Sequence, residues 1–309
     1  MAEVTAKLVK QLRDQTGAGM MDCKAALVEV AGNLEDATDW LRKKGLAAAA
    51  KKAGRLASEG LVGLEVDGRR GVMVEVNSET DFVARNQDFQ ALVSTIAGLA
   101  LAAGGDFDRL LQATVPSSGR NVADEIAQNI AVIGENMNLR RAAAVEVADG
   151  VVGSYVHSAL APGLGKIGVL VGLQSAGDPG QLAALGKQLA MHIAAAKPLA
   201  VSVDRIDPRE LERERAIYAE QARASGKPDS IVEKIVDGRV RKFYEEVVLL
   251  EQVYVIDTDL KVRAAIERVA ETIGSSITVT GFERFALGEG LEARTSNLAE
   301  EVSAQLADT

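Results

Sequence analysis

The feature that most constrains the fold of this chain is a change in the spacing of its apolar residues at Gly60. Before Gly60, apolar residues recur every three or four positions, which is the spacing of a helix face. After it, they alternate on both sides of an Asp-Gly pair, at Leu64 and Val66 and then at Val72, Val74 and Val76. Two alternating runs joined by Asp-Gly predict an antiparallel β-hairpin.

Helical spacing returns after this hairpin. Phe89, Leu92, Val93, Ile96 and Leu99 fit one face of a helix, and a second pattern covers residues 122–133. A hairpin followed by helices predicts an α+β unit with an antiparallel sheet.

The same plan recurs later in the chain. Residues 150–153 (Gly-Val-Val-Gly) echo residues 60–63 (Gly-Leu-Val-Gly), and residues 168–171 echo 71–74 before a predicted helix at 181–196. The offset between the copies grows from 90 to 97 residues, so the second hairpin should have a longer tip, at residues 159–166. We therefore predict a duplicated α+β core.

The segment before the hairpins is predicted to be a compact bundle of three short helices that resembles ubiquitin-associated domains. Asn33 is the expected N-cap of the third helix and Gly45 its expected end. The Ala- and Lys-rich residues 46–58 should form an extension or linker helix. The expected inward faces are Val4, Leu8 and Leu12, then Cys23, Leu27 and Val30, then Leu34, Ala37 and Leu41.

A charged, helical segment interrupts the second half of the core at residues 208–250, with a break at 226–228. Near-heptad spacing predicts an antiparallel coiled-coil arm, although two ordinary helices packed on the body would also fit. The expected facing sets are Leu211, Tyr218 and Ala222 against Ile231, Ile235, Phe243 and Val247.

A helix at 260–273, a strand at 277–285 and a polar tail at 295–309 are expected to complete the chain. The resulting division is a bundle at 1–54, a first core half at 55–145, a second core half with a C-terminal module at 146–207 and 251–290, an arm at 208–250 and a tail at 291–309.

Composition limits the class of partner. The chain has 309 residues and a net charge of -9, which argues against affinity gained by neutralising phosphates, so we expect a protein partner and no direct nucleic-acid binding. Its single cysteine, Cys23, excludes an internal disulfide framework and fits a reducing cytoplasm. The chain shows neither a membrane-spanning apolar run nor a signal peptide at its start, so a cytoplasmic location is expected.

Two patterns suggest nucleotide binding or catalysis, but the residues around them do not fit either function. Residues 163–168 have Gly-x-Gly-x-x-Gly spacing, but they precede a strand and open no helix, so they fit a hairpin tip and neither a dinucleotide site nor a P-loop. The two histidines, His157 and His192, have no second ligand at metal-binding spacing. No cofactor, metal or catalytic residue is predicted. His192 should be a packed helix residue, and His157 lies near the tip of the second hairpin.

The most informative candidate site follows the first hairpin, at residues 75–86. An acid and an aromatic, Asp81 and Phe82, stand just past the strand end, where no core pattern requires them. An aromatic in this place can anchor a partner protein, or it can pack under the next helix.

Four segments resemble signatures of the bacterial elongation factor Ts family, and their order along the chain is the order that the family shows. They are residues 75–86, residues 12–27 (Leu-Arg-Asp-Gln-Thr-Gly-Ala-Gly-Met-Met-Asp-Cys-Lys-Ala-Ala-Leu), residues 134–141 (Gly-Glu-Asn-Met-Asn-Leu-Arg-Arg) and residues 190–198 (Ala-Met-His-Ile-Ala-Ala-Ala-Lys-Pro). The likeness runs from about residue 2 to about residue 292.

This resemblance implies a guanine nucleotide exchange factor that binds elongation factor Tu, GDP-bound or nucleotide-free, during translation elongation and makes no covalent bond. It implies a nucleotide-releasing contact at Thr80, Asp81, Phe82 and Val83, with Phe82 as the wedge. It implies further contacts at Arg13, Met20, Met21, His157, Val255 and Ile256. The last two could equally form an edge strand.

Other interpretations of the sequence are also open. A translation-associated scaffold would use the bundle and arm only to hold proteins together. A hydrolase or a nucleotide-binding enzyme is disfavoured by the failed glycine spacings and by the scarcity of His and Cys. The tip at 158–166 is longer than the short turn expected of the family, which puts the reach of His157 in doubt. A homodimer through the arm is also open.

Overall fold

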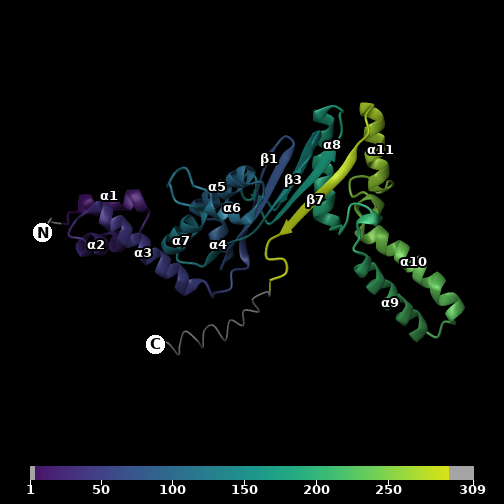
Figure 1. Cartoon of the computed structure of the whole chain (residues 1–309), viewed down its shortest axis with the longest axis horizontal. Coiled ribbons are helices and arrows are strands. Elements are labelled where there is room, and N and C mark those ends of the chain that lie inside the picture. Colours follow the sequence, from purple (N-terminus) through teal and green to yellow (C-terminus); the bar gives the residue numbers. More distant parts are fainter. Residues whose placement is uncertain (1–3, 292–309) are drawn as a thin grey trace.

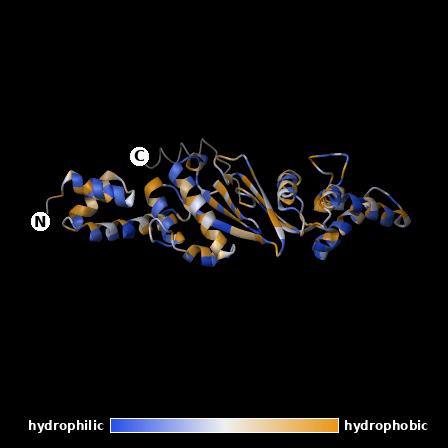
Figure 2. Ribbon diagram, turned by 90° about the horizontal axis from the view of Figure 1, so that it is seen from above, coloured by the Kyte–Doolittle hydropathy of each residue, from blue (hydrophilic) through white to orange (hydrophobic). Residues whose placement is uncertain are grey.

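The computed structural model describes residues 4–291, so the expected tail at 295–309 lies outside the described residues. The molecule is elongated, with a helical bundle at one end, two sheets in the middle and a helical hairpin at the other end (Figure 1). Seen from above, the helices of the bundle and the hairpin carry interleaved hydrophilic and hydrophobic stretches, as amphipathic helices do (Figure 2).

The bundle consists of α1 (Ala6–Thr16), α2 (Met20–Glu29) and α3 (Leu34–Lys52). Its core is formed by the predicted inward faces, centred on Leu12, Cys23 and Leu27. Asn33 caps α3 as predicted, because its side chain accepts hydrogen bonds from the backbone N–H groups of Glu35 and Asp36.

The predicted end of α3 at Gly45 is wrong, because the helix continues through Gly45 to Lys52. Gly45 is buried where α3 crosses α7 (Val122–Ile133), and a Cβ atom there would lie 3.3 Å from the Cβ of Ala131. The glycine serves close packing of two helices, which offsets its lower helix propensity. One continuous helix therefore carries the bundle onto the core, in place of a separate linker helix at 46–58.

The first half of the core is a sheet with helices on its outer face. Its elements are β1 (Glu59–Asp67), β2 (Arg70–Ser78), α4 (Asp81–Ala84), α5 (Gln87–Ala103), α6 (Phe107–Gln112), α7 and β3 (Met137–Glu146). The strand order is β3-β2-β1-β5, and all pairs are antiparallel. Strand β3 and helix α6 had not been predicted, since β3 carries adjacent arginines and alanines and does not alternate cleanly.

The second half repeats this plan with β4 (Gly150–His157), β6 (Ile167–Gln174), α8 (Pro179–Ala196), α11 (Val262–Ile273) and β7 (Thr278–Ala286), in strand order β4-β6-β7. The two sheets face each other through a shared apolar core that includes Leu64, Met73 and Leu170. Helix α5 covers the outer face of the first sheet and α8 that of the second.

The two hairpins match in their backbones. Gly60 and Gly150 both have positive φ, of 122° and 117°, and a Cβ atom at either would lie 2.2 or 2.0 Å from a carbonyl oxygen of the neighbouring strand. Each second strand also shifts register against its outer neighbour, between Glu75 and Val76 in β2 and between Gly172 and Leu173 in β6. These two shifts are separated by the same 97-residue offset as the second pair of repeats in the sequence.

The long tip of the second hairpin has a structural role. Its strand β5 (Leu164–Gly165) pairs with β1 of the first sheet, through Val62 with Gly165 and Gly63 with Leu164. The Gly-rich residues 163–168 are thus a hairpin tip, as predicted, and they join the two sheets.

The segment at 208–250 is an antiparallel helical hairpin of α9 (Pro208–Ala224) and α10 (Asp229–Val247), with the short 3₁₀ helices η1 (Val203–Arg205) and η2 (Leu249–Glu251) beside it. The predicted inward face of α10 is wrong at its start, because Ile231 is exposed and Val232, Val236 and Val240 pack against Ala222 instead. A shift of one residue turns a helix face by about 100°, which moves Ile231 out of the seam.

A buried carboxylate ties the first sheet to the end of β7. Glu75 is fully buried and its carboxylate accepts hydrogen bonds from Arg140 (3.0 Å), Arg141 (2.6 Å), Asn77 (3.1 Å) and the backbone N–H of Gly288 (2.9 Å). Burial alone would raise the pKa of Glu75, but the hydrogen bonds from Gly288, Asn77, Arg141 and Arg140 lower it below its ordinary value.

The two arginines extend this network to the C-terminal part of the chain. Arg140 donates to the carbonyl oxygen of Glu289 at 2.6 Å, and Arg141 donates to that of Ala286 at 3.1 Å. The guanidinium of Arg141 also lies 4.0 Å from the centre of the Phe285 ring. The network therefore joins β2, β3 and the end of β7.

We expect Glu75→Gln to lower the free energy of unfolding by about 3–5 kcal/mol at pH 7, because it leaves two arginines around a neutral group. Since the folded pKa of Glu75 is lowered, its contribution is complete above its ordinary value of 4.5 and is lost as the pH falls through the folded pKa. Urea denaturation of both proteins across this range measures the difference, which should shrink below pH 4.5.

The matched control is Glu65→Gln, which removes an exposed carboxylate from the same hairpin. Equal effects of the two substitutions at pH 7 would contradict a structural role for the Glu75 network.

Candidate functional site

Phe82 stands out on the surface because its aromatic side chain is 76 % exposed. It lies in α4, a single helical turn of four residues that follows β2. Val83 and Ala84 occupy the core side of this turn, which leaves Asp81 and Phe82 on the solvent side. The alternative that Phe82 packs under the next helix is therefore wrong.

Val83 differs from the other residues expected to form this contact. It is only 4 % exposed and belongs to the apolar core of the first half. A buried side chain offers no surface to a partner, so the expected contact by Val83 is corrected to a supporting role, in which it anchors the turn from below.

The turn is held in place by a carboxylate from a distant segment. Glu135 accepts hydrogen bonds from the backbone N–H of Thr80 at 2.9 Å and from its hydroxyl at 2.6 Å. Beside it, Glu79 accepts from the backbone N–H of Asn136 at 2.6 Å and forms an ion pair with Arg55 at 3.5 Å. Residues 75–86 and 134–141, two of the segments singled out in the sequence, are thus in direct contact.

The chemical consequence is a preorganised aromatic anchor. Phe82 is carried by a turn whose backbone is bonded at both ends. The N–H of Thr80 donates to Glu135 at the start, and the N–H groups of Arg85 and Asn86 donate to carbonyl oxygens of the turn at its end. An apolar ring held rigidly in solvent loses little conformational entropy when a partner covers it.

A second group of exposed side chains lies at the joint between α1 and α2. Met20 and Met21 are exposed at the start of α2, and Arg13 is exposed in the last turn of α1. Gly17 ends α1 in the left-handed conformation, with φ of 69°, which turns the chain sharply towards α2. The three side chains predicted to contact a partner are therefore all available on the bundle.

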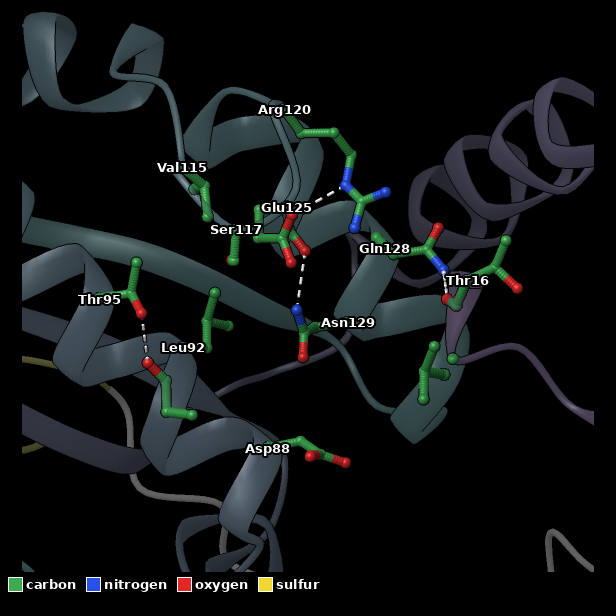
Figure 3. Close-up of a pocket in the computed structure, with 13 residues that line it drawn as sticks. Thr16, Asp88, Leu92, Thr95, Val115, Ser117, Arg120, Glu125, Gln128 and Asn129 are labelled. Atoms are coloured by element: carbon green, nitrogen blue, oxygen red, sulfur yellow. Dashed lines mark hydrogen bonds and ion pairs between the residues drawn. The ribbon is translucent and has the colours of Figure 1, made fainter. Parts of the chain in front are cut away.

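The bundle is joined to the first half through polar contacts and the crossing of α3 with α7. Gln128 donates to the carbonyl oxygen of Thr16 at 3.0 Å, and Arg42 pairs with Asp124 at 2.6 Å. A pocket of about 300 Å³ lies at this joint (Figure 3), where Arg120 pairs with Glu125 at 2.8 Å. Because the Gln128 and Arg42 contacts cross the joint and the Arg120 pair lies on its core side, the pocket is a junction between the bundle and the core.

His157 and the pair Val255 and Ile256 lie in the second half. His157 is exposed at the end of β4, with Nδ1 3.2 Å from the hydroxyl of Tyr155, and its carbonyl oxygen accepts from the N–H of Lys166 at 3.1 Å. Val255 and Ile256 are exposed between η2 and α11, in a segment that forms no strand. The edge-strand alternative for these two residues is therefore wrong.

The described part of the chain offers little for other chemistries. Within residues 4–291, no group of three or more His, Cys, Asp or Glu side chains is placed to hold a metal ion. None of the helices in that range is long and apolar enough to cross a membrane. Cys23 is buried in the bundle, where desolvation raises the pKa of its thiol.

Glu135 had not been predicted as part of the site. Its only sequence signal was its place in the segment 134–141, because the contact with Thr80 spans 55 residues. Spacing along the chain carries no information about a contact of that length.

We expect Glu135→Ala to loosen the turn that carries Phe82 and to lower the free energy of unfolding by about 1.5–3 kcal/mol, the usual worth of hydrogen bonds to a charged group. Amide hydrogen exchange should show faster exchange at Thr80, and urea denaturation gives the stability. Glu135→Gln keeps one acceptor oxygen for one of the two bonds, so its stability and its exchange at Thr80 should lie between those of the wild type and the Ala variant. Unchanged exchange at Thr80 in the Ala variant would refute the clamp.

The chain is similar to known proteins over nearly its whole length. The family described as Elongation factor TS matches residues 79–289 of this chain. The elongation factor Ts of Rhodospirillum rubrum is 60 % identical over 307 residues, which cover 99 % of each chain. That of Rhodospirillum centenum is 58 % identical over 303 residues, covering 98 % of this chain and 99 % of its own. That of Parvibaculum lavamentivorans is 57 % identical over 304 residues, again 98 % and 99 %.

Proposed function

Because the chain belongs to the elongation factor Ts family of translation elongation factors, we propose that it is the guanine nucleotide exchange factor of elongation factor Tu. It binds the GDP complex of that partner in the cytoplasm, promotes release of GDP and leaves a nucleotide-free complex that GTP then loads. It makes and breaks no covalent bond, and its partner is a protein.

The observation that carries this proposal is the exposed ring of Phe82 on a turn clamped by Glu135. A rigid aromatic can insert between helices of a partner and displace the elements that position a magnesium ion and the nucleotide phosphates. Asp81, exposed beside it, orients the insertion through a polar contact.

Two contact surfaces bind the partner while Phe82 acts as the wedge. Arg13, Met20 and Met21 on the bundle, together with the first half, contact the nucleotide-binding domain. His157, Val255 and Ile256 on the second half contact a β-domain. This division is supported by the exposure of all six side chains on elements at separate parts of the molecule. The bundle is ubiquitin-associated-like, and the hairpin of α9 and α10 is a coiled-coil arm.

The binding of GDP and the binding of this protein to elongation factor Tu are thermodynamically linked. If this protein weakens the binding of GDP to elongation factor Tu by some factor, GDP must weaken the binding of this protein by the same factor. Nucleotide and exchange factor are therefore competing ligands, and a high supply of GTP displaces the factor so that it acts repeatedly.

We expect wild-type protein in substoichiometric amounts to accelerate the release of a fluorescent GDP analogue from elongation factor Tu, chased with unlabelled GDP. Phe82→Ala should lose a hot-spot contribution of about 2 kcal/mol, which is about 30-fold in the maximal acceleration. Direct binding of the variant to nucleotide-free elongation factor Tu should fall much less than the rate.

Ile217→Ala is the matched control, since Ile217 is an exposed apolar residue on the arm, away from the wedge. Binding of wild type without any acceleration would favour a scaffold over an exchange factor. Equal rates for Phe82→Ala and wild type would exclude Phe82 as the wedge.

A further inference from the structure

A buried polar network lies between α8 and the segment 252–256, outside the surfaces described above. At its centre is His192, which is fully buried on α8. Its Nε2 lies 2.9 Å from the side-chain oxygen of Gln252, and its Nδ1 lies 3.2 Å from the backbone nitrogen of Val255. One imidazole therefore contacts two points of the segment that follows the arm.

The partners of Gln252 fix the protonation of this imidazole. The side-chain nitrogen of Gln252 donates to the carbonyl oxygens of Glu246 (2.7 Å) and Ala196 (3.2 Å), so its oxygen is left as an acceptor. The N–H of Val255 can only donate, so Nδ1 must accept. His192 is thus neutral and carries its proton on Nε2. Burial lowers the pKa of His192, and the hydrogen bond with Gln252 offsets part of that effect.

The N–H of Val255 bonds to His192, whereas the other backbone bonds of this segment hold Tyr254, whose N–H donates to Leu260 at 2.8 Å and whose carbonyl oxygen accepts from Asp257 at 3.2 Å. Tyr254 is buried, with its hydroxyl 3.2 Å from the side-chain oxygen of Gln188 and its ring centre 5.7 Å from that of His192. Around it, Val253, Val255 and Ile256 are 54 %, 44 % and 45 % exposed. The buried ring of Tyr254, its backbone bonds and the bond from Val255 to His192 together orient three neighbouring apolar side chains towards solvent.

We propose that His192 is a positioning residue that preforms the segment 253–256 for docking, with Val253 as a further contact. The identity of the docking partner, the β-domain of elongation factor Tu, rests on the proposed function. The Nδ1 acceptor holds the Val255 backbone in its bound orientation before the partner arrives, which lowers the entropic cost of association. His192 touches neither the partner nor the Phe82 wedge.

Two amide variants separate the two nitrogens of the imidazole. In His192→Asn, the side-chain oxygen takes the place of Nδ1 and can still accept from Val255. In His192→Gln, the side-chain nitrogen takes the place of Nε2 and can still donate to Gln252. Both variants leave a cavity at the same core site, so each is the matched control for the other.

Amide hydrogen exchange of Val255 in the free protein gives the first readout. We expect exchange close to wild type in the Asn variant and about fivefold or more faster in the Gln variant, the loss of one hydrogen bond. In GDP release from elongation factor Tu, the Gln variant should need about fivefold more protein for half-saturation, with the maximal rate unchanged. The Asn variant should match wild type.

A merely structural role would give the same exchange and the same half-saturation in both variants, with a parallel loss of stability in urea, and that result would overturn the proposal. The expected exchange at Val255 without any GDP release by wild type would refute the proposed function and leave the positioning role intact. If neither variant folds, nitrogen NMR of the wild-type imidazole decides, because a proton on Nδ1 of His192 is incompatible with the proposal.

Discussion

The architecture depends on one buried carboxylate. Glu75 carries a full charge into the middle of the molecule, which is tolerable only because two guanidinium groups, an amide and a backbone N–H surround it. Its arginines, Arg140 and Arg141, also bond to the backbone after β7. The chain before the described end at residue 291 is thereby tied to a strand more than 200 residues earlier. The two core halves are therefore joined by the Glu75 network as well as by their shared apolar core.

The candidate site begins where this locked strand ends. Strand β2 runs from the Glu75 network to Ser78, and the next residues form the clamped turn of Thr80 and Phe82. Arg140 and Arg141 of the network lie in β3, and Glu135, which holds the turn, lies just before it, so Phe82 stands beside a densely hydrogen-bonded part of the sheet. In the second half, the imidazole of His192 holds an exposed apolar segment in the same way, from inside the core. Rigid support beneath exposed apolar groups is the common design of the two surfaces.

Much of this could be predicted from local patterns. Alternation located the hairpins, helical spacing placed α5 and α7, and Asn33 was recognised as a cap, because each of these depends on residues a few positions apart. The errors also have local causes. Gly45 was taken as a helix end because glycine is a poor helix former. A glycine is needed there because Ala131, a residue 86 positions away, packs closely against it. Val83 was grouped with Phe82 through the family resemblance, although neighbouring residues on one helical turn point in different directions.

The sequence by itself determined most of the strands and helices and the repeat of the hairpin plan, because periodicity and turn chemistry indicate which face of an element is apolar. It marked Asp81 and Phe82 as residues that no core pattern requires, and the structure decided that they face solvent. Only the tertiary structure decided which faces meet. It paired β5 with β1, brought Glu135 to Thr80 and Gln252 to His192, and closed the arginines around Glu75. Those contacts join residues from 55 to more than 100 positions apart, and a hydrophobic pattern specifies that a face must be buried without specifying its partner.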